Sequence, residues 1–432
     1  MILKGKTAAF VTLGCKLNFS ETSSIRRSLE DEGVATVAEK DGADIFVINT
    51  CSVTDVAEHK GRQLIRKIAK HNPQSYIVVV GCYAQLRAKE LMEIEGVNLV
   101  LGINEKFKVA DYLKHCEDKQ KQQLPHSCNV FEDLNFDIAC SYGDRTRCFL
   151  KIQDGCNYFC TYCTIPFARG TSRSASIEDV VKNVNEVAAK GVKEIILTGV
   201  NTGDFGNGRN ENFLQLIQQL DDNKSIERFR ISSIEPNLLS DEIIAFVASS
   251  GKFMPHFHIP LQAGSNEVLQ LMKRRYTTEF FAEKIATINR LCPDTFVGVD
   301  IIAGMRGETE ELFEKSARFI EDLQISQLHV FPYSERAGTK ALEITPAVNQ
   351  TEKHRRVNVL LEISRQKLKD FHHKFYGQIR NVLFEDNSQH TNRMFISGFT
   401  DNYIQVRLPY NPELANQIVP VRLTSENITE DA

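Results

Sequence analysis

Three of the chain's eleven cysteines stand in one short run, Cys156-Asn157-Tyr158-Phe159-Cys160-Thr161-Tyr162-Cys163. Structural zinc sites usually take four ligands arranged as two pairs, and a saturated 4Fe–4S cluster also takes four cysteines. Three cysteines at this spacing instead bind three irons of a cubane cluster and leave the fourth iron open. The run therefore predicts an iron–sulfur cluster that binds a small molecule. A zinc knuckle or a group of surface thiols is the alternative.

An open iron suits a ligand with neighbouring amino and carboxylate groups, and S-adenosylmethionine carries both. Electron transfer from the cluster then breaks a carbon–sulfur bond and releases an adenosyl radical. The run comes just after a predicted strand, Phe149 to Ile152, so it stands at the carboxyl end where α/β barrels place their sites. Position and spacing together favour radical chemistry.

Three further cysteines each follow a predicted strand. Cys15 ends the first, Cys51 the second and Cys82 the third. Because parallel strands bring their carboxyl ends to one edge of a sheet, we expect these thiols to converge. They then hold a second cluster, again with an open iron. The alternative is that each is a small buried hydrophobe.

The remaining cysteines show no tight spacing and are interpreted as structural, although one of them, Cys148, lies close in sequence to the triple-cysteine run. They are Cys116, Cys128, Cys140, Cys148 and Cys292.

The first hundred residues alternate between short apolar strands and amphipathic helices. This pattern predicts a parallel sheet covered by helices on both faces. The predicted strands are Ala8 to Leu13, Asp44 to Asn49, Tyr76 to Val80 and Asn98 to Leu101, and the predicted helices are Glu21 to Glu32, Ala57 to Lys70 and Ala84 to Ile94.

A second alternation predicts six βα units, which favours a partial (βα)6 barrel over an eight-unit barrel. An open doubly wound sheet is the alternative. The tetrad Ser176-Ile177-Glu178-Asp179 predicts a capped helix start. The predicted strands are Phe149 to Ile152, Glu194 to Thr198, Arg228 to Ser232, His256 to Pro260, Phe296 to Ile302 and Gln327 to Phe331.

After a long basic helix, four short strands separated by turn residues predict a small C-terminal β-barrel of oligonucleotide-binding type. These strands are Gly377 to Glu385, Arg393 to Gly398, Tyr403 to Leu408 and Val419 to Leu423. The whole chain is then expected to be α/β. The predicted divisions are an N-terminal α/β domain at 1–115, a linker at 116–145, the partial barrel at 146–375 and the small barrel at 376–432.

With 432 residues, 42% of them hydrophobic, and a net charge of -4, the chain is typical of a soluble protein of about three domains. A chain-wide basic coat for nucleic acid is excluded, and no apolar stretch approaches the roughly 20 residues of a membrane helix. We expect a cytoplasmic protein. Locally, the helix from Lys353 to Lys374 is basic, which suits either a phosphate backbone or a solvated face.

Together, these features resemble the radical S-adenosylmethionine methylthiotransferases. The residues that carry the resemblance are Leu13-Gly14-Cys15-Lys16-Leu17-Asn18, Asn49-Thr50-Cys51-Ser52-Val53-Thr54, Gly81-Cys82-Tyr83-Ala84-Gln85, the triple-cysteine run, Pro260-Leu261-Gln262-Ala263-Gly264-Ser265 and Leu328-His329-Val330-Phe331-Pro332-Tyr333-Ser334. The resemblance implies two 4Fe–4S clusters, an auxiliary one on Cys15, Cys51 and Cys82 and one in the barrel on Cys156, Cys160 and Cys163. It also implies a radical-SAM barrel and a C-terminal TRAM module.

Within that family, Leu-Gly-Cys-Lys at the first cysteine is most similar to the branch acting on N6-threonylcarbamoyladenosine beside the tRNA anticodon. The isopentenyladenosine branch usually has tyrosine before the glycine and glutamine after the cysteine, and the ribosomal-protein branch usually has proline there. The resemblance implies that a methylthio group joins an adenine carbon, with tRNA as partner. An electron donor of flavodoxin or ferredoxin type is also implied, and the sulfur donor is unknown.

Four residues at strand ends or beside the cluster are expected to contact S-adenosylmethionine: Tyr162, Asn201, Glu235 and Gln262. One loop departs from the family, because Gly304-Met305-Arg306-Gly307-Glu308 replaces the usual Gly-Phe-Pro-Gly-Glu. A cobalamin-dependent methyltransferase is disfavoured, since His59 lacks the Asp-x-His-x-x-Gly context of a cobalamin loop. A non-catalytic iron–sulfur RNA-binding scaffold is the non-enzyme alternative.

Overall fold

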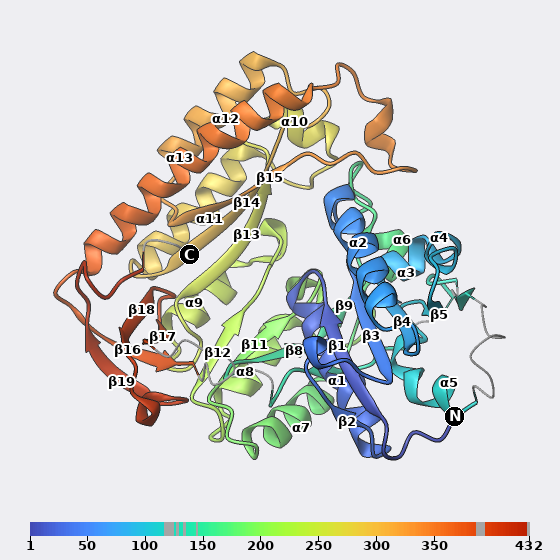
Figure 1. Cartoon of the computed structure of the whole chain (residues 1–432). Helices are drawn as coiled ribbons and strands as arrows, with labels where there is room; N and C mark the ends of the chain where they lie inside the picture. The colour runs from blue at the N-terminus through green and yellow to red at the C-terminus, as the bar shows by residue number, and fades with distance from the viewer. Residues whose placement is uncertain (116–124, 127–128, 133–134, 144–145, 386–393, 430–432) are drawn as a thin grey trace.

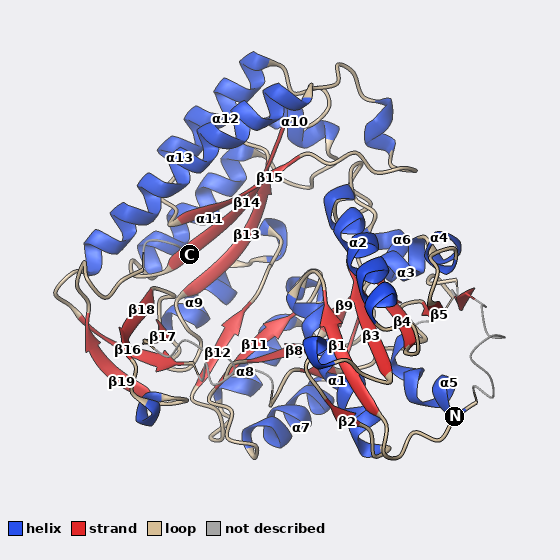
Figure 2. Ribbon diagram, viewed as in Figure 1, coloured by secondary structure: helices blue, strands red, loops and turns tan. Residues whose placement is uncertain are grey.

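The computed structural model describes residues 1–115, 125–126, 129–132, 135–143, 146–385 and 394–429. A parallel sheet comes first along the chain, a longer series of parallel strands follows, and a small antiparallel sheet ends it (Figure 1). The first and last sheets lie on opposite sides of the middle strands (Figure 2). None of the helices in these ranges is long and apolar enough to cross a membrane.

The N-terminal sheet is parallel throughout, as predicted, in the order β2-β1-β3-β4-β5-β6. Helices α1 and α5 cover one face and α2 and α4 the other, so every residue of β3 and β4 is buried. The strands are β1 Thr7–Thr12, β2 Ala35–Thr36, β3 Ile45–Thr50, β4 Tyr76–Gly81, β5 Val97–Leu101 and β6 Pro125–His126, and the helices are α1 Lys16–Asp31, α2 Asp55–His71, α3 Cys82–Leu86, α4 Ala88–Met92 and α5 Val109–Lys114.

Two predicted helices of this region differ in the structure. The helix expected from Ala84 is two short helices, because Arg87 between them leaves the helical region, with a φ of -136° and a ψ of 40°. Helix α1 begins five residues earlier than predicted, directly after Cys15. Its first two turns bury Asn18 and Glu21, so no apolar period marks them in the sequence.

The six predicted barrel strands all form, and they lie side by side in their sequence order. They make two sheets, β12-β11-β8-β7 and β13-β14-β15, which parallel bridges join at Ser233–His258 and Phe229–Phe253. A doubly wound sheet would reverse its strand order, so this arrangement favours the barrel. The strands are β7 Ala139–Cys140, β8 Cys148–Lys151, β9 Gln153–Asp154, β10 Arg173–Ser174, β11 Glu194–Thr198, β12 Arg228–Ile231, β13 His256–Gln262, β14 Phe296–Ala303 and β15 Gln327–Pro332.

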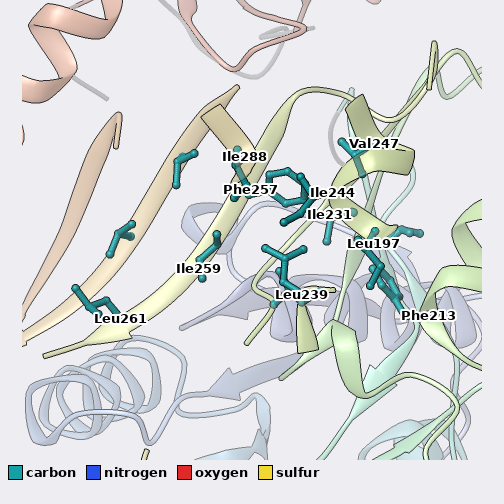
Figure 3. Close-up of a cluster of buried hydrophobic side chains, with 14 of the residues drawn as sticks. Leu197, Phe213, Ile231, Leu239, Ile244, Val247, Phe257, Ile259, Leu261 and Ile288 are labelled. Carbon is teal, nitrogen blue, oxygen red and sulfur yellow. The ribbon is translucent and has the colours of Figure 1, made fainter. Parts of the chain in front are cut away.

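Helices pack outside these strands and bury their apolar faces against them. Figure 3 shows part of this core, where Leu197 and Ile231 of the strands meet Phe213 and Ile244 of the helices. The predicted cap of α7 forms, since the side chain of Ser176 accepts from the backbone N–H of Asp179 at 3.1 Å. The helices are α6 Ile165–Arg169, α7 Ile177–Ala188, α8 Phe213–Asp221, α9 Asp241–Ser249, α10 Asn266–Leu271, α11 Thr278–Leu291, α12 Glu310–Asp322 and α13 Gln350–Phe375.

The four C-terminal strands pair antiparallel in the order β18-β17-β16-β19. Arg230 attaches this sheet to the barrel: it pairs with Glu194 at 2.8 Å and donates to Thr400 O at 2.7 Å and Asp401 O at 2.8 Å. Closure into the small barrel that we predicted is not shown among the described residues. The strands are β16 Ile379–Phe384, β17 Phe395–Thr400, β18 Gln405–Pro409 and β19 Ile418–Arg422.

Half of the predicted linker at 116–145 falls outside the described residues, as do Cys116 and Cys128. Two of its described pieces extend sheets. β6 pairs with β5 of the N-terminal sheet, and β7 pairs antiparallel with β8.

Candidate active site

The three N-terminal cysteines lie at one edge of the first sheet. Cys15 follows β1 and precedes α1, Cys51 follows β3, and Cys82 follows β4, which are neighbouring strands. Burial, together with the nearby Cys82 and Cys15 thiols, raises the pKa of the Cys51 thiol to about 12. The structure therefore brings together the thiols that the sequence predicted would converge.

Glycines directly before two of these cysteines allow the close approach. Gly14 has a φ of +110°, and a Cβ there would lie 2.8 Å from Cys51 Cβ. Gly81 has a φ of +103°, and its Cβ would lie 2.4 Å from Thr50 O. Only glycine accommodates both the backbone conformation and the neighbour, so these positions pack the thiol-bearing loops against each other.

A buried arginine connects this thiol set to the barrel. Arg169, at the end of α6, donates from Nε to Cys82 Sγ at 3.2 Å and also bonds Glu21 of α1 at 3.0 Å and Asp154 of β9 at 2.9 Å. Burial alone would raise the pKa of Glu21, but Arg169, Lys106 and Lys151 outweigh it and lower that pKa to about 2. The thiols thus sit beside a fixed positive charge whose partners come from both parts of the molecule.

The triple-cysteine run occupies the loop between β9 and α6. Burial raises the pKa of Cys156 and Cys163 to about 12, with neighbouring thiols adding to the effect. Arg274 donates from Nη1 to Cys160 Sγ at 3.2 Å and pairs with Glu235. This second thiol set therefore has its own cation.

The two cysteine loops touch each other. Thr164, directly after Cys163, donates from its hydroxyl to Ser52 O at 3.4 Å, and Ser52 directly follows Cys51. Arg336 donates to Ser52 Oγ at 3.1 Å, and the Asp55 backbone N–H donates to Ser334 Oγ at 2.9 Å. Contacts from both parts of the chain thus hold the loops together.

A cavity of about 240 Å³ opens at this junction. The N-terminal part contributes residues just after Cys51, and the barrel contributes the residue before Cys163 and the ends of β13, β14 and β15. The lining residues are Val53, Thr54, Tyr162, Gln262, Asp300, Ile302, Phe331, Pro332, Tyr333 and Ser334.

The thiol sets fit a polynuclear cluster better than a single metal ion. A tetrahedral zinc with Zn–S bonds of about 2.3 Å holds its sulfurs roughly 3.8 Å apart. Among the described residues, neither thiol set has all three sulfurs within 4.8 Å of one another; the group of ligand residues that meets this distance is His258, Asp300 and His329. More widely spaced thiols beside a cation suit an anionic iron–sulfur cluster.

Of the four residues predicted to contact S-adenosylmethionine, Tyr162 and Gln262 line the cavity. Asn201 and Glu235 do not line it. They lie together, with Asn201 Oδ1 accepting from the Glu235 backbone N–H at 3.3 Å. The buried Asn201 Nδ2 has no partner among the described residues, so a donor here is available to a ligand.

The sequence interpretation missed Arg169, Arg274 and Arg336. Their spacing in the sequence shows no recognisable motif, and their roles depend on partners far away along the chain. Arg169 and Glu21, for example, are separated by 148 positions in the sequence. Three of the cysteines interpreted as structural or incidental are described: Cys140 and Cys148 are buried, and Cys292 is half-buried. Cys148 is fully buried at the start of β8, the strand end remote from the triple-cysteine loop, and it hydrogen-bonds Cys140.

The loop that departs from the family lies beside the cavity but not in its lining. Met305 is buried, and Arg306 pairs with Glu335 at 2.8 Å and donates to Leu342 O at 3.1 Å.

Most cations of the basic helix α13 are engaged within the chain: Arg356 bonds Glu308, Arg365 bonds Glu362, and Lys367 donates to Leu323 O. These contacts favour a structural face over a phosphate-binding one.

Comparisons with known proteins agree with this geometry. Residues 150–320 match the Radical SAM superfamily and residues 7–102 match Uncharacterized protein family UPF0004. The threonylcarbamoyladenosine tRNA methylthiotransferase MtaB of Bacillus subtilis is 39% identical, over 96% of this chain and 93% of that protein. The tRNA-2-methylthio-N(6)-dimethylallyladenosine synthase of Thermodesulfovibrio yellowstonii is 31% identical, over 98% and 96%.

Among solved structures, the radical S-adenosylmethionine methyltransferase TsrM of Kitasatospora setae shares the fold. Its TM-score is 0.55 at 15% identity, over 76% of this chain and 74% of that one. The two cysteine sets, the partial barrel and the full-length relatives lead to one conclusion: this chain belongs to the radical S-adenosylmethionine tRNA methylthiotransferase family.

Proposed function

We propose that this chain adds a methylthio group to C2 of N6-threonylcarbamoyladenosine next to the tRNA anticodon. The observation that carries the proposal is that both cysteine loops open onto one cavity, with Val53 and Thr54 after Cys51 facing Tyr162 before Cys163. A reaction that takes sulfur from one site and a radical from another requires such a shared space. The relative with 39% identity is named for the threonylcarbamoyl substrate, and the one with 31% for the dimethylallyl substrate.

In this proposal the two thiol sets hold two 4Fe–4S clusters, the auxiliary one on the N-terminal set. Bound in the barrel, a cluster and S-adenosylmethionine supply the one-electron chemistry that cleaves an aromatic C–H bond, which offers no useful acidity to an acid–base enzyme. Arg169 and Arg274 compensate the negative charge that deprotonated thiols bring into a buried place. Tyr162, Asn201, Glu235 and Gln262 would contact S-adenosylmethionine, the last three at its nucleoside part. Tyr162 and Gln262 line the cavity, and the buried Asn201 Nδ2 is an unpaired donor among the described residues.

The protein's own contribution is to exclude water and stray hydrogen donors. The apolar part of the cavity wall, with Ile302, Phe331 and Pro332, serves this purpose. The Thr164–Ser52 and Asp55–Ser334 contacts keep the N-terminal loop closed over the barrel.

We assign these tasks to an N-terminal auxiliary-cluster domain at 1–115, a radical-SAM barrel at 146–375 and a TRAM-like module at 376–432 that recognises tRNA, with 116–145 as linker. Reduction of the barrel cluster requires an electron donor of flavodoxin or ferredoxin type. A tRNA substrate and such donors place the reaction in the cytoplasm.

Nucleoside analysis tests the proposal. The anaerobically reconstituted enzyme, with S-adenosylmethionine, sulfide and a reductant, is incubated with tRNA that bears threonylcarbamoyladenosine, and the digested tRNA is examined by mass spectrometry. We expect 2-methylthio-N6-threonylcarbamoyladenosine from the wild type and none from Cys160→Ala. A product formed only on dimethylallyladenosine, or on no tRNA at all, would refute the assignment.

A further inference from the structure

Three polar side chains meet on the inner face of the barrel strands β13, β14 and β15. His258 Nε2 lies 2.7 Å from Asp300 Oδ1, His329 Nδ1 lies 3.1 Å from the same oxygen, and the two ring nitrogens are 3.3 Å apart. Because Asp300 pairs in register with His329 and lies one strand from His258, the sheet itself sets this arrangement. We call these residues the His–Asp–His group.

The charges in the group are defined by its hydrogen bonds. Burial alone would raise the pKa of Asp300, but the bonds from His258 and His329 hold that pKa well below its usual range, so the carboxylate is ionised. An ionised carboxylate accepts, so His258 donates from Nε2 and His329 from Nδ1. The opposite nitrogen of each ring, His258 Nδ1 and His329 Nε2, has no partner among the described residues and is left to bind something else.

The group is accessible, unlike the buried Arg230–Glu194 pair of the same barrel. Its side chains are 21%, 19% and 38% exposed for His258, Asp300 and His329, whereas Arg230 and Glu194 are 1% and 0% exposed. Asp300 also lines the cavity between the two cysteine loops, next to Ile302 and the half-exposed Phe331. An apolar cavity with a few convergent polar groups is the usual form of a small-molecule subsite.

We propose that the His–Asp–His group binds the polar substituent on N6 of the substrate adenosine and makes the enzyme selective for it; this rests on the proposed function. A threonylcarbamoyl substituent offers ureido N–H groups, a hydroxyl and a carboxylate. The free nitrogens of His258 and His329 accept from N–H or O–H donors when the rings are neutral, and donate to the carboxylate when the rings are protonated. Asp300 holds both rings in place for this contact.

The same group disfavours an apolar substituent. A dimethylallyl chain has no donor or acceptor, so binding it would remove water from the two histidines and leave them unpaired. Sites built to hydrogen-bond a substrate reject an analogue without the polar groups far more strongly than apolar pockets reject an extra group. The group therefore separates the two substrates for which the relatives are named.

The test uses the reconstituted enzyme and anticodon stem-loops whose adenosine is unmodified or bears a threonylcarbamoyl or a dimethylallyl group. Variants His329→Phe, His258→Gln and Asp300→Asn are compared with wild type and with His354→Asn, an exposed histidine of α13 as matched control. We expect each of the three to weaken binding of the threonylcarbamoyl stem-loop by roughly 10- to 100-fold, the loss for a hydrogen bond to a charged group. Binding of the unmodified stem-loop, iron content and the control should not change.

Selectivity supplies the second readout. The ratio of kcat/KM for the threonylcarbamoyl over the dimethylallyl stem-loop should fall in His329→Phe, while S-adenosylmethionine cleavage without tRNA stays at the wild-type rate. An unchanged ratio and unchanged binding in all three variants would overturn the inference even if wild type makes the expected product. Loss of one equivalent of a bound divalent metal in Asp300→Asn would also overturn it, because the group would then be a metal site. If wild type makes no methylthio product, the proposed function itself fails.

Discussion

The two thiol sets reach similar arrangements in opposite ways. The barrel set comes from eight consecutive residues in one loop, whereas the N-terminal set comes from three loops spread over 68 residues, from Cys15 to Cys82. The first depends on local chain geometry. The second depends on three parallel strands being adjacent and on glycines that allow the loops to touch. Damage to the fold should therefore affect the N-terminal set first.

The arginines beside the two thiol sets also differ in whether their partners are local or come from distant parts of the chain. Arg169 beside Cys82 is buried among carboxylates from both parts of the molecule, while Arg274 beside Cys160 pairs with Glu235, whose side chain is 14% exposed. The N-terminal set is thus coupled to the interface between the two parts, and the barrel set is supported within the barrel.

The largest expected effect comes from removing each set in turn. Wild type should bind about eight irons after anaerobic reconstitution, and Cys156→Ala/Cys160→Ala/Cys163→Ala should bind about four, as two 4Fe–4S sites require. Cys15→Ala/Cys51→Ala/Cys82→Ala should also bind about four. Iron and sulfide counting checks this. Four irons in wild type and none in the barrel variant would mean that the N-terminal cysteines are structural.

The second largest effect is expected from replacing the arginine beside each thiol set, because the two replacements should lower stability by different amounts. Arg169→Met leaves Glu21 and Asp154 buried without their central partner, and breaking such pairs costs about 3 kcal/mol or more. Arg274→Met should cost about 1 kcal/mol, because water reaches Glu235. Anaerobic urea unfolding compares the two. Equal midpoints for both variants would show that the interface is not the more sensitive place.

Replacing a single glycine should reduce iron binding by the N-terminal thiol set only. Gly14→Ala adds a Cβ at 2.8 Å from Cys51 Cβ and places alanine at positive φ, a strain of about 1–3 kcal/mol. We expect reduced iron in the N-terminal set while the barrel set keeps its four. The control is Gly5→Ala, which has a φ of +81° but no atom within 4 Å of the added Cβ. If both variants lose iron alike, backbone strain and not the contact with Cys51 is responsible.

The smallest effect is expected outside both sets. Cys148→Ala removes a fully buried sulfur at the far end of β8, which should lower stability by about 1 kcal/mol and leave the iron count at about eight. Cys292→Ala, which replaces a half-buried cysteine at the end of α11, serves as the matched control. A drop in iron for Cys148→Ala would assign that thiol to the barrel cluster.

Local patterns of residue types were enough to predict the parts of this protein that depend on near neighbours in the chain. The periodicity of hydrophobic residues located β11 at its observed bounds and the other barrel strands to within a residue or two. The spacing of Cys156, Cys160 and Cys163 predicted a cluster-binding loop. Even the N-terminal thiols were found this way, because each one follows a readable strand. The first turns of α1 were missed, since their buried groups are polar and find partners in other elements.

Which distant charges meet could not be predicted from these local patterns, because it depends on how the elements pack. Arg169 finds Glu21 and Asp154, and His258, Asp300 and His329 come together only because β13, β14 and β15 are adjacent in register. The cavity at Val53 and Tyr162 likewise exists only once the N-terminal loop closes over the barrel. The spacing of hydrophobic residues along the chain indicates which face of a helix or strand is buried. A polar contact between two elements produces no such repeating pattern. The substrate subsite can therefore be recognised only in the assembled fold.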